Sequence, residues 1–348
     1  MKVRHNYFVL WFFAMALVAL TPAHSYGQET VQERLNRDVP KDGKKRYFTF
    51  TTENDLYGAG TDQNYTNGLR LGWFKARQKP PGITEEFEKI LPFLDINETT
   101  SVAYSLGHNI YTPDAVESPF QDPNDRPWAA FLYGSMAMVT LEANHIDEYE
   151  LTLGVVGPMA LGEPIQRTWH KLVDSTNPSG WDNQLSNEPG LILSWQRRWP
   201  QAWYADMDDL FVSFMPHAGA TVGNIYTYAN AGGTVKLSPG ANRWGDKPLR
   251  VRPAIPGTGY FRASDKLSWE LFFGLDGRAV ARNIFLDGNT FTSSHSIDKK
   301  PLVADANVGV ALTYGHTRLS YTLVYRTKEF DGQNNEDIFG AVSIGYNF

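Results

Sequence analysis

The chain has 348 residues, a formal net charge of −6 and no cysteine. Aromatic residues make up 14% of it, yet its mean hydropathy is negative, at −0.37. Nothing in this mildly acidic balance indicates nucleic-acid binding, so we expect no nucleic-acid partner. The lack of cysteine excludes a disulfide framework and is weakly indicative of a protein that crosses an oxidising compartment.

The N-terminal residues have the pattern of an export signal. A short basic stretch is followed by an apolar run over residues 7–20 and by small residues that permit cleavage after Ser25 or Gly27. We therefore predict a signal peptide over residues 1–27 and one mature domain over residues 28–348. The alternative, a retained membrane anchor, is disfavoured because the apolar run is shorter than the roughly 20 residues that a helical span needs.

Beyond this signal the sequence has no second apolar run long enough for a membrane helix, so a mature membrane protein would have to be a β-barrel. Apolar and polar residues alternate in segments of about ten residues, separated by Gly, Pro, Asn and Asp, as in transmembrane strands. In one segment Leu319 and Tyr321 lie on one face, whereas Arg318 and Ser320 lie on the other. The segments number about twelve and begin near Arg46, Tyr65, Thr100, Trp128, His145, Gly190, Asp209, Gly223, Lys266, Leu302, Thr317 and Asp337.

The last segment alternates up to the C-terminal residue. Ile338, Val342, Ile344 and Tyr346 share one face, and the chain closes on Phe348. This ending resembles the assembly signal that outer-membrane barrels present to the barrel assembly machinery, although a soluble β-sandwich could end in the same way. We predict an all-β fold, a transmembrane antiparallel β-barrel of about twelve strands in a Gram-negative outer membrane, with short helices in extracellular loops.

Two stretches interrupt the strand pattern. Residues 80–97 carry apolar residues at helical spacing and are predicted to be a loop with a short helix. Residues 162–187 form the second interruption, in which Gln166 and His170 lie one helical turn apart on the same face. Loops of this length in a barrel usually carry function.

Polar residues gather where the first two strands meet. Asn54 and Asp55 end the first segment and Thr66 begins the second, so a hairpin would bring an amide, a carboxylate and a hydroxyl together. The alternative is ordinary turn chemistry. His170 is a stronger candidate, because Gln166 could orient its ring and a neutral imidazole can deprotonate water near neutral pH.

Blocks of residues along nearly the whole mature chain resemble, in order, those of the lipid A 3-O-deacylases of Gram-negative outer membranes. The blocks are Glu53-Asn54-Asp55, Thr61-Asp62, Tyr65-Thr66-Asn67-Gly68, Gly107-His108-Asn109-Ile110-Tyr111-Thr112-Pro113, Asp125-Arg126-Pro127-Trp128-Ala129, Gly154-Val155-Val156-Gly157-Pro158, Gln166 with His170, and Gly180-Trp181-Asp182-Asn183-Gln184-Leu185. One departure is Trp128, where the family leads us to expect a smaller aromatic residue.

The resemblance implies a barrel of about twelve strands and a calcium-dependent hydrolase that removes the acyl or acyloxyacyl chain from the 3'-position of lipid A. By similarity His170 is the general base, and Asn54, Asp55, Thr66 and Gln166 line the site. We hypothesise that Asp55 holds Ca²⁺ together with backbone or amide oxygens.

The expected partners are lipid A or lipopolysaccharide as substrate and the lipids of the outer membrane, and we expect a monomer. The sequence contains no Gly-x-Ser-x-Gly elbow that would indicate a serine nucleophile. Two alternatives remain open, an outer-membrane phospholipase and a non-enzymatic structural barrel or narrow pore. Strand parity places the first hairpin and the loop between strands five and six on the same outer rim, so Asn54 and His170 can meet.

Overall fold

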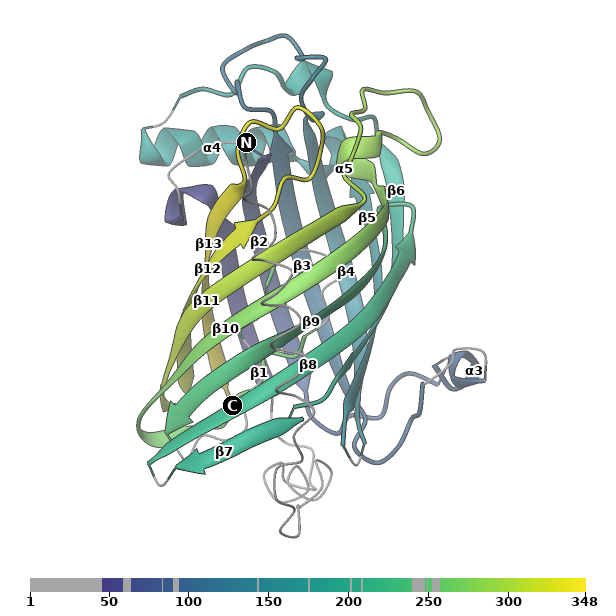
Figure 1. The fold of residues 1–348 in the computed structure, drawn as a ribbon. Coiled ribbons are helices and arrows are strands. Elements are labelled where there is room, and N and C mark those ends of the chain that lie inside the picture. The colour runs from purple at the N-terminus through teal and green to yellow at the C-terminus, as the bar shows by residue number, and fades with distance from the viewer. Residues whose placement is uncertain are drawn as a thin grey trace, which may run out of the picture.

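The computed structural model describes residues 46–58, 64–82, 84–89, 94–142, 144–174, 176–200, 202–207, 209–239, 248, 250–251 and 257–348. The predicted signal peptide lies outside these residues. Within them the chain forms one antiparallel sheet of thirteen strands that closes into a barrel (Figure 1). The predicted barrel is therefore confirmed.

Twelve of the thirteen strands make the wall, because β7 (Trp203–Met207) pairs only with β8. The twelve are β1 (Arg46–Asn54), β2 (Asn64–Lys75), β3 (Ser101–Thr112), β4 (Ala129–Leu141), β5 (Ile146–Val156), β6 (Glu188–Arg198), β8 (Leu210–Gly223), β9 (Tyr226–Pro239), β10 (Ser264–Asn283), β11 (Leu302–Gly315), β12 (Thr317–Arg326) and β13 (Asp337–Asn347). Each begins within three residues of a predicted start.

The barrel closes at two seams. β1 pairs with β13, and β6 pairs with β8 through residues 192–198 and 217–223. Below that pairing β7 takes the place of β6 along residues 210–214 of β8. The sequence did not predict β7, because five residues are too few to show a period-two pattern.

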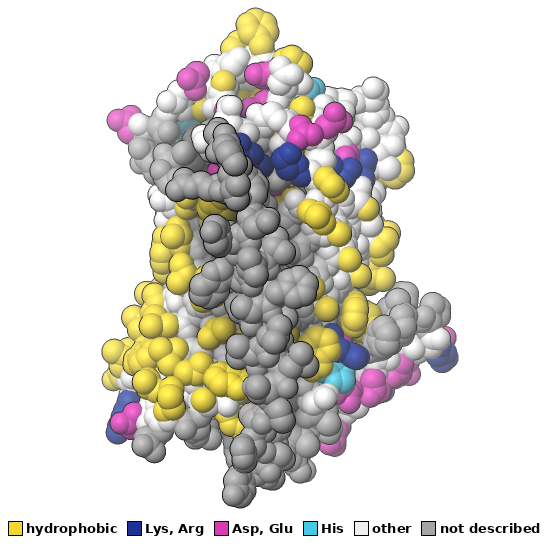
Figure 2. Space-filling view, viewed as in Figure 1, with side chains coloured by type: hydrophobic (Ala, Val, Ile, Leu, Met, Phe, Trp, Pro, Cys, Tyr) yellow, Lys and Arg dark blue, Asp and Glu magenta, His cyan; other side chains and the backbone are white. Residues whose placement is uncertain are grey.

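Alternation along the wall separates a lipid-facing surface from a polar lumen. In β1 the side chains of Thr49, Thr51 and Glu53 are buried toward the lumen, whereas Phe50 is exposed on the outside. Figure 2 shows hydrophobic side chains gathered over the barrel wall. No helix in the described part of the chain is long and apolar enough to cross a membrane.

Ion pairs on the lumen side of the wall connect neighbouring and nearby strands. Carboxylates and cations from different strands meet as Arg70–Glu150, Arg198–Glu148, Lys236–Glu270, Arg318–Glu270, Arg278–Asp305 and Arg326–Asp305. These side chains are almost fully buried, so each charge depends on its partner rather than on bulk water.

Replacing Arg70 by methionine should destabilise the barrel by about 3–5 kcal/mol, the usual cost of leaving a buried charge without its partner. Nη2 of Arg70 lies 3.0 Å from Oε2 of Glu150, and no side-chain surface of Glu150 is exposed. The loss should appear as a lower temperature for conversion of the heat-modifiable folded band on SDS gels. Adding Glu150→Leu to the variant should restore most of the lost stability; a double variant no more stable than the single one would contradict the assignment.

The connection between β9 and β10 reaches into the lumen. Arg250 forms an ion pair with Glu53, and the backbone N–H of Val251 donates to Oε1 of Glu53 at 3.1 Å. The hydroxyl of Tyr133 donates to the carbonyl of Val251. Protein atoms therefore fill part of the barrel interior.

The two interruptions of the strand pattern carry helices, as predicted. α3 (Thr84–Glu88) lies in the connection between β2 and β3, and α4 (Gly162–Val173) follows β5 at the opposite end of the barrel (Figure 1). The end with α4 also carries η1 (Asp55–Tyr57), η2 (Pro158–Ala160), η3 (Trp181–Asn183) and α5 (Ile284–Asp287). Helices thus occur at both ends, because β2 runs back to the end where β1 begins, whereas β5 and β10 run away from it.

Candidate active site

A cavity of about 460 Å³ lies between the barrel wall and α4. Strands β1, β2 and β3 supply one side and helix α4 supplies the other. Its lining residues are Thr52, Asn54, Leu56, Thr66, Asn67, Leu69, Ile110, Leu161, Pro164, Ile165, Gln166, Thr168, Trp169 and His170. Four of the five predicted site residues are among them.

The cavity is on the outside of the barrel wall. Asn54 shares the face of β1 that carries the exposed Phe50, and Leu69 shares the face of β2 that carries the exposed Leu71. Ile110 likewise shares the outward face of β3 with Leu106. The lining therefore continues directly into the apolar outer surface of the barrel.

Helix α4 is held against the outer wall by an apolar cluster. Ile165 of α4 packs with Ala160, Trp128, Trp181 and Ile110, all of which are buried. This cluster fixes how far the helix stands from the strands and hence the width of the cavity.

Glycine is required at two points of this packing. A Cβ on Gly162 would come within 2.4 Å of the Trp181 ring, and one on Gly180 within 2.5 Å of the Trp128 ring. Larger residues would push α4 or η3 away from the wall.

His170 lies near the end of α4 and is 4% exposed. Its Nδ1 bonds the backbone carbonyl of Thr176. Since a carbonyl only accepts, Nδ1 carries the proton and the neutral ring has its lone pair on Nε2. The ring is therefore in the tautomer that a base acting through Nε2 requires.

Gln166 lies one turn before His170 and lines the same cavity. Its Oε1 accepts a hydrogen bond of 2.8 Å from Nε1 of Trp181. The hydrogen bond that orients the His170 ring thus comes from Thr176, whereas Gln166 is itself oriented by Trp181.

Asn54 and Thr66 face each other across the hairpin of β1 and β2. Nδ2 of Asn54 donates to the carbonyl of Thr66 at 2.9 Å, and its Oδ1 accepts from the backbone N–H of Leu56 at 2.8 Å, which caps η1. The hydroxyl of Thr66 lies 2.6 Å from that of Thr112. These bonds make the strand end a rigid edge of the cavity.

Asp55 follows Asn54 as the first residue of η1 and is 3% exposed. Its Oδ1 accepts from the N–H of Leu56 at 2.9 Å. The residue adjoins the cavity through Asn54 but is not part of the lining. Within the described residues no three histidine or acidic side chains are grouped as they would be around a metal.

The loop before β4 packs beside this region. The carboxylate of Asp125 accepts hydrogen bonds from the backbone N–H groups of Asp114 and Arg126, each at 2.7 Å. Burial raises the pKa of Asp125, even though these two bonds favour its charged form. Asp125 therefore serves to fold the loop and does not face the cavity.

A family model described as outer membrane protein LpxR matches residues 10–348. The chain belongs to the LpxR family. The match spans every described element, including both sides of the cavity, and it confirms the resemblance predicted from the sequence. Membership of this family together with the barrel places the protein in the outer membrane.

Among the solved structures that match, one shows the same fold. LpxR from Salmonella typhimurium superposes with a TM-score of 0.70 at 20% identity, covering 86% of this chain and 99% of that one. The KdgM porin gives a TM-score of 0.36 at 7% identity, covering 87% and 99% of the two chains. No curated protein sequence matches this chain.

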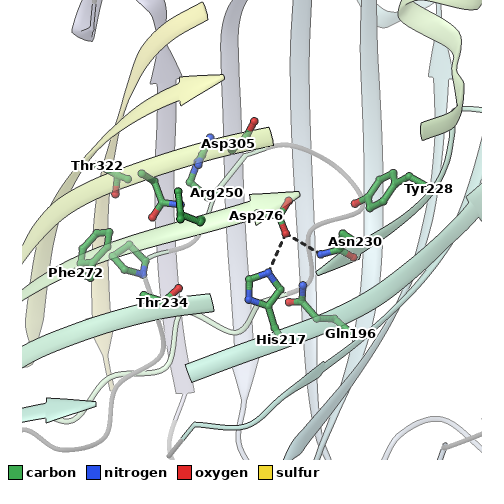
Figure 3. A pocket seen from close by; sticks show the side chains of 13 residues that line it. Gln196, His217, Tyr228, Asn230, Thr234, Arg250, Phe272, Asp276, Asp305 and Thr322 are labelled. Atoms are coloured by element: carbon green, nitrogen blue, oxygen red, sulfur yellow. Dashed lines mark hydrogen bonds and ion pairs between the residues drawn. The ribbon is translucent and has the colours of Figure 1, made fainter. Parts of the chain in front are cut away.

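A second cavity in this LpxR-family barrel lies within the lumen and measures about 50 Å³. There Asp276 accepts hydrogen bonds of 2.9 Å from Nε2 of His217 and from Nδ2 of Asn230 (Figure 3). It contains none of the predicted site residues, and its volume is about one ninth of that of the outer cavity. The outer cavity is therefore the candidate active site.

Sequence reasoning missed Thr176 and Trp181 as partners of His170 and Gln166. Trp181 did occur in one of the blocks that resemble the family, so its place in the site could have been suspected. No local pattern marks Thr176, whose contribution is a backbone carbonyl.

Proposed function

We propose that this protein is a lipid A 3-O-deacylase that hydrolyses the ester at the 3'-position of lipid A. The observation that carries the proposal is that Asn54, Thr66, Gln166 and His170, which come from distant parts of the chain, line one cavity. They are a base, two amides and a hydroxyl beside an apolar surface, which suits hydrolysis of a lipid ester.

The position of the cavity supports a substrate that stays in the membrane. Leu56 and Leu161 line it and are about half exposed, at 46% and 51%. Their exposed apolar side chains would meet an acyl chain that enters from the lipid around the wall, so the chain would stay in an apolar environment. With the first hairpin extracellular, as strand parity predicts, the cavity would face the outer leaflet, where lipid A resides.

In the proposed reaction Nε2 of His170 takes a proton from water as the water oxygen attacks the ester carbonyl carbon. The tetrahedral intermediate then releases the sugar hydroxyl, which receives the proton from His170, and the fatty acid leaves. The carbonyl of Thr176 holds Nδ1–H and stabilises the imidazolium formed between the two steps. Asn54 and Thr66 shape the edge against which the substrate lies.

The oxygen-rich surroundings of Asp55 fit calcium in chemical type. Ca²⁺ takes carboxylate, amide and backbone oxygens, and such oxygens are present at the end of β1 around Asp55 and Asn54. We assign Asp55 as the carboxylate ligand, completed by backbone and amide oxygens. When bound, calcium would polarise the ester carbonyl.

The two alternatives are less well supported. A non-enzymatic barrel does not explain why Asn54, Thr66, Gln166 and His170 line one cavity. The protein atoms of Arg250 and Val251 inside the lumen argue in addition against an open pore. A phospholipase would use the same groups on a glycerophospholipid, so only the substrate separates it from the deacylase.

Mass spectrometry of lipid A tests the proposal directly. We expect lipid A from cells that express the chain to lose the mass of the 3'-linked acyl or acyloxyacyl group, and lipid A from cells without it to keep that mass. A His170→Ala variant that still folds provides the inactive control. Unchanged lipid A accompanied by accumulating lysophospholipid would refute the deacylase in favour of the phospholipase.

A further inference from the structure

The hydrogen bond between Trp181 and Gln166 determines which atom of the Gln166 amide is the oxygen and which is the nitrogen. An indole N–H is a donor only, so the atom 2.8 Å from Nε1 of Trp181 must be the amide oxygen. The NH₂ group of Gln166 is therefore directed away from Trp181. The positions of the amide oxygen and nitrogen are thus assigned by hydrogen-bond chemistry, since the two ends of the amide have nearly the same shape.

The NH₂ group of Gln166 has no hydrogen-bond partner among the described residues, although the side chain is buried, with 2% exposed. Buried donors are normally paired, and an unpaired one lowers stability. Gln166 lines the outer cavity, so this donor is available to a molecule that enters there. Nε1 of Trp169, another lining residue of α4, is also buried without a partner.

The unpaired N–H groups of Gln166 and Trp169 lie on one face of α4, so a molecule bound in the cavity should offer them a hydrogen-bond acceptor. The carbonyl oxygen of an ester is such an acceptor, and it becomes more negative as water adds to the carbonyl carbon. We propose that Nε2 of Gln166 donates a hydrogen bond to the ester carbonyl oxygen of the substrate, and that Trp181 is the positioning residue that holds the amide in this sense. This inference rests on the proposed ester hydrolysis.

Trp181 is well placed to hold the amide rigidly. It is 1% exposed, and its ring packs against Trp128 with centroids 5.2 Å apart. The close approach of Gly162 leaves its ring no space to move toward α4. A donor held in advance stabilises charge more effectively than one that must first rotate into place.

A double-mutant cycle tests the inference with purified, folded full-length protein and lipid A. Gln166→Ala should lower kcat by about 10²–10³-fold, the usual loss for one such donor. Trp181→Phe removes only the indole N–H and should lower kcat by about tenfold to a hundredfold with little change in KM. In the Gln166→Ala background Trp181→Phe should have no further effect, because residues that act through one another are not additive.

Two further variants sharpen the test. Gln166→Glu keeps an acceptor for Trp181 but has no donor at neutral pH, so it should lose as much activity as Gln166→Ala. Trp128→Phe shrinks the neighbouring ring without touching the amide, and it should change stability more than kcat. Additive effects of Trp181→Phe and Gln166→Ala, or full activity of Gln166→Glu, would overturn the inference while leaving the deacylase intact. A wild-type protein that releases no acyl chain from lipid A would overturn the proposed function and the inference together.

Discussion

Replacing His170 by alanine should lower the rate of lipid A deacylation by about 10²–10⁴-fold, the range that a positioned general base contributes. The loss should fall on kcat, because the apolar lining that would hold the acyl chain is unchanged. Release of the 3'-linked fatty acid from purified lipid A, followed over time, measures it. The described lining holds no second histidine and no carboxylate, so no other group of the lining can take the place of His170 as a base.

His316→Ala is the matched control for this experiment. His316 lies in the turn between β11 and β12, and its Nδ1 is 2.8 Å from the carbonyl of Asn347. That turn is at the end of the barrel opposite the cavity, so the control should keep wild-type activity. Activity retained by a folded His170→Ala barrel would show that another group activates the water.

Replacing Asp55 by asparagine should abolish the response of activity to calcium and lower the rate by about a hundredfold or more, the scale of a lost metal-assisted step. The change keeps the size of the side chain and its ability to accept from the N–H of Leu56, which holds η1 in place. It removes the negative charge that would bind a divalent cation. Deacylation measured during titration with a chelator and then with added Ca²⁺ reports both effects.

Asp122→Asn provides the comparison for Asp55. Asp122 is an exposed carboxylate that caps a nearby turn by accepting from the N–H of Asn124 at 2.8 Å. Its replacement should leave the calcium response unchanged. If wild-type activity ignores the chelator, or if Asp55→Asn responds to calcium as wild type does, Asp55 is not a metal ligand of this site.

The barrel was predictable in detail because its signal is local. A strand between lipid and lumen must alternate its side chains, and residues 317–326 show that pattern without reference to any other strand. In the structure the same alternation puts Asn54 on the outer face of β1, together with Phe50. β7 escaped prediction because its pairing depends on where β6 ends along β8, a long-range property.

The candidate site was predictable in its residues and less so in its arrangement. The sequence shows the helical spacing of Gln166 and His170, and it shows the hairpin that joins Asn54 to Thr66. Strand parity predicted that the hairpin and the helix lie at the same end of the barrel. Nothing in those patterns says that α4 would fold down over the outside of the wall. That position depends on the packing of residues such as Trp128 and Trp181, which are far apart in the chain.

By itself, the sequence determined that this protein is a barrel of the LpxR family with a base, an amide and a hydroxyl at one rim. The tertiary structure alone decided that the cavity opens to the outside of the wall, that Thr176 sets the tautomer of His170, and that Trp181 turns the NH₂ group of Gln166 away from itself. The physical reason is that alternation and helical spacing act over a few residues. In contrast, the direction of a hydrogen bond and the position of a loop on the wall depend on residues far apart in the chain, which come into contact only when the chain folds.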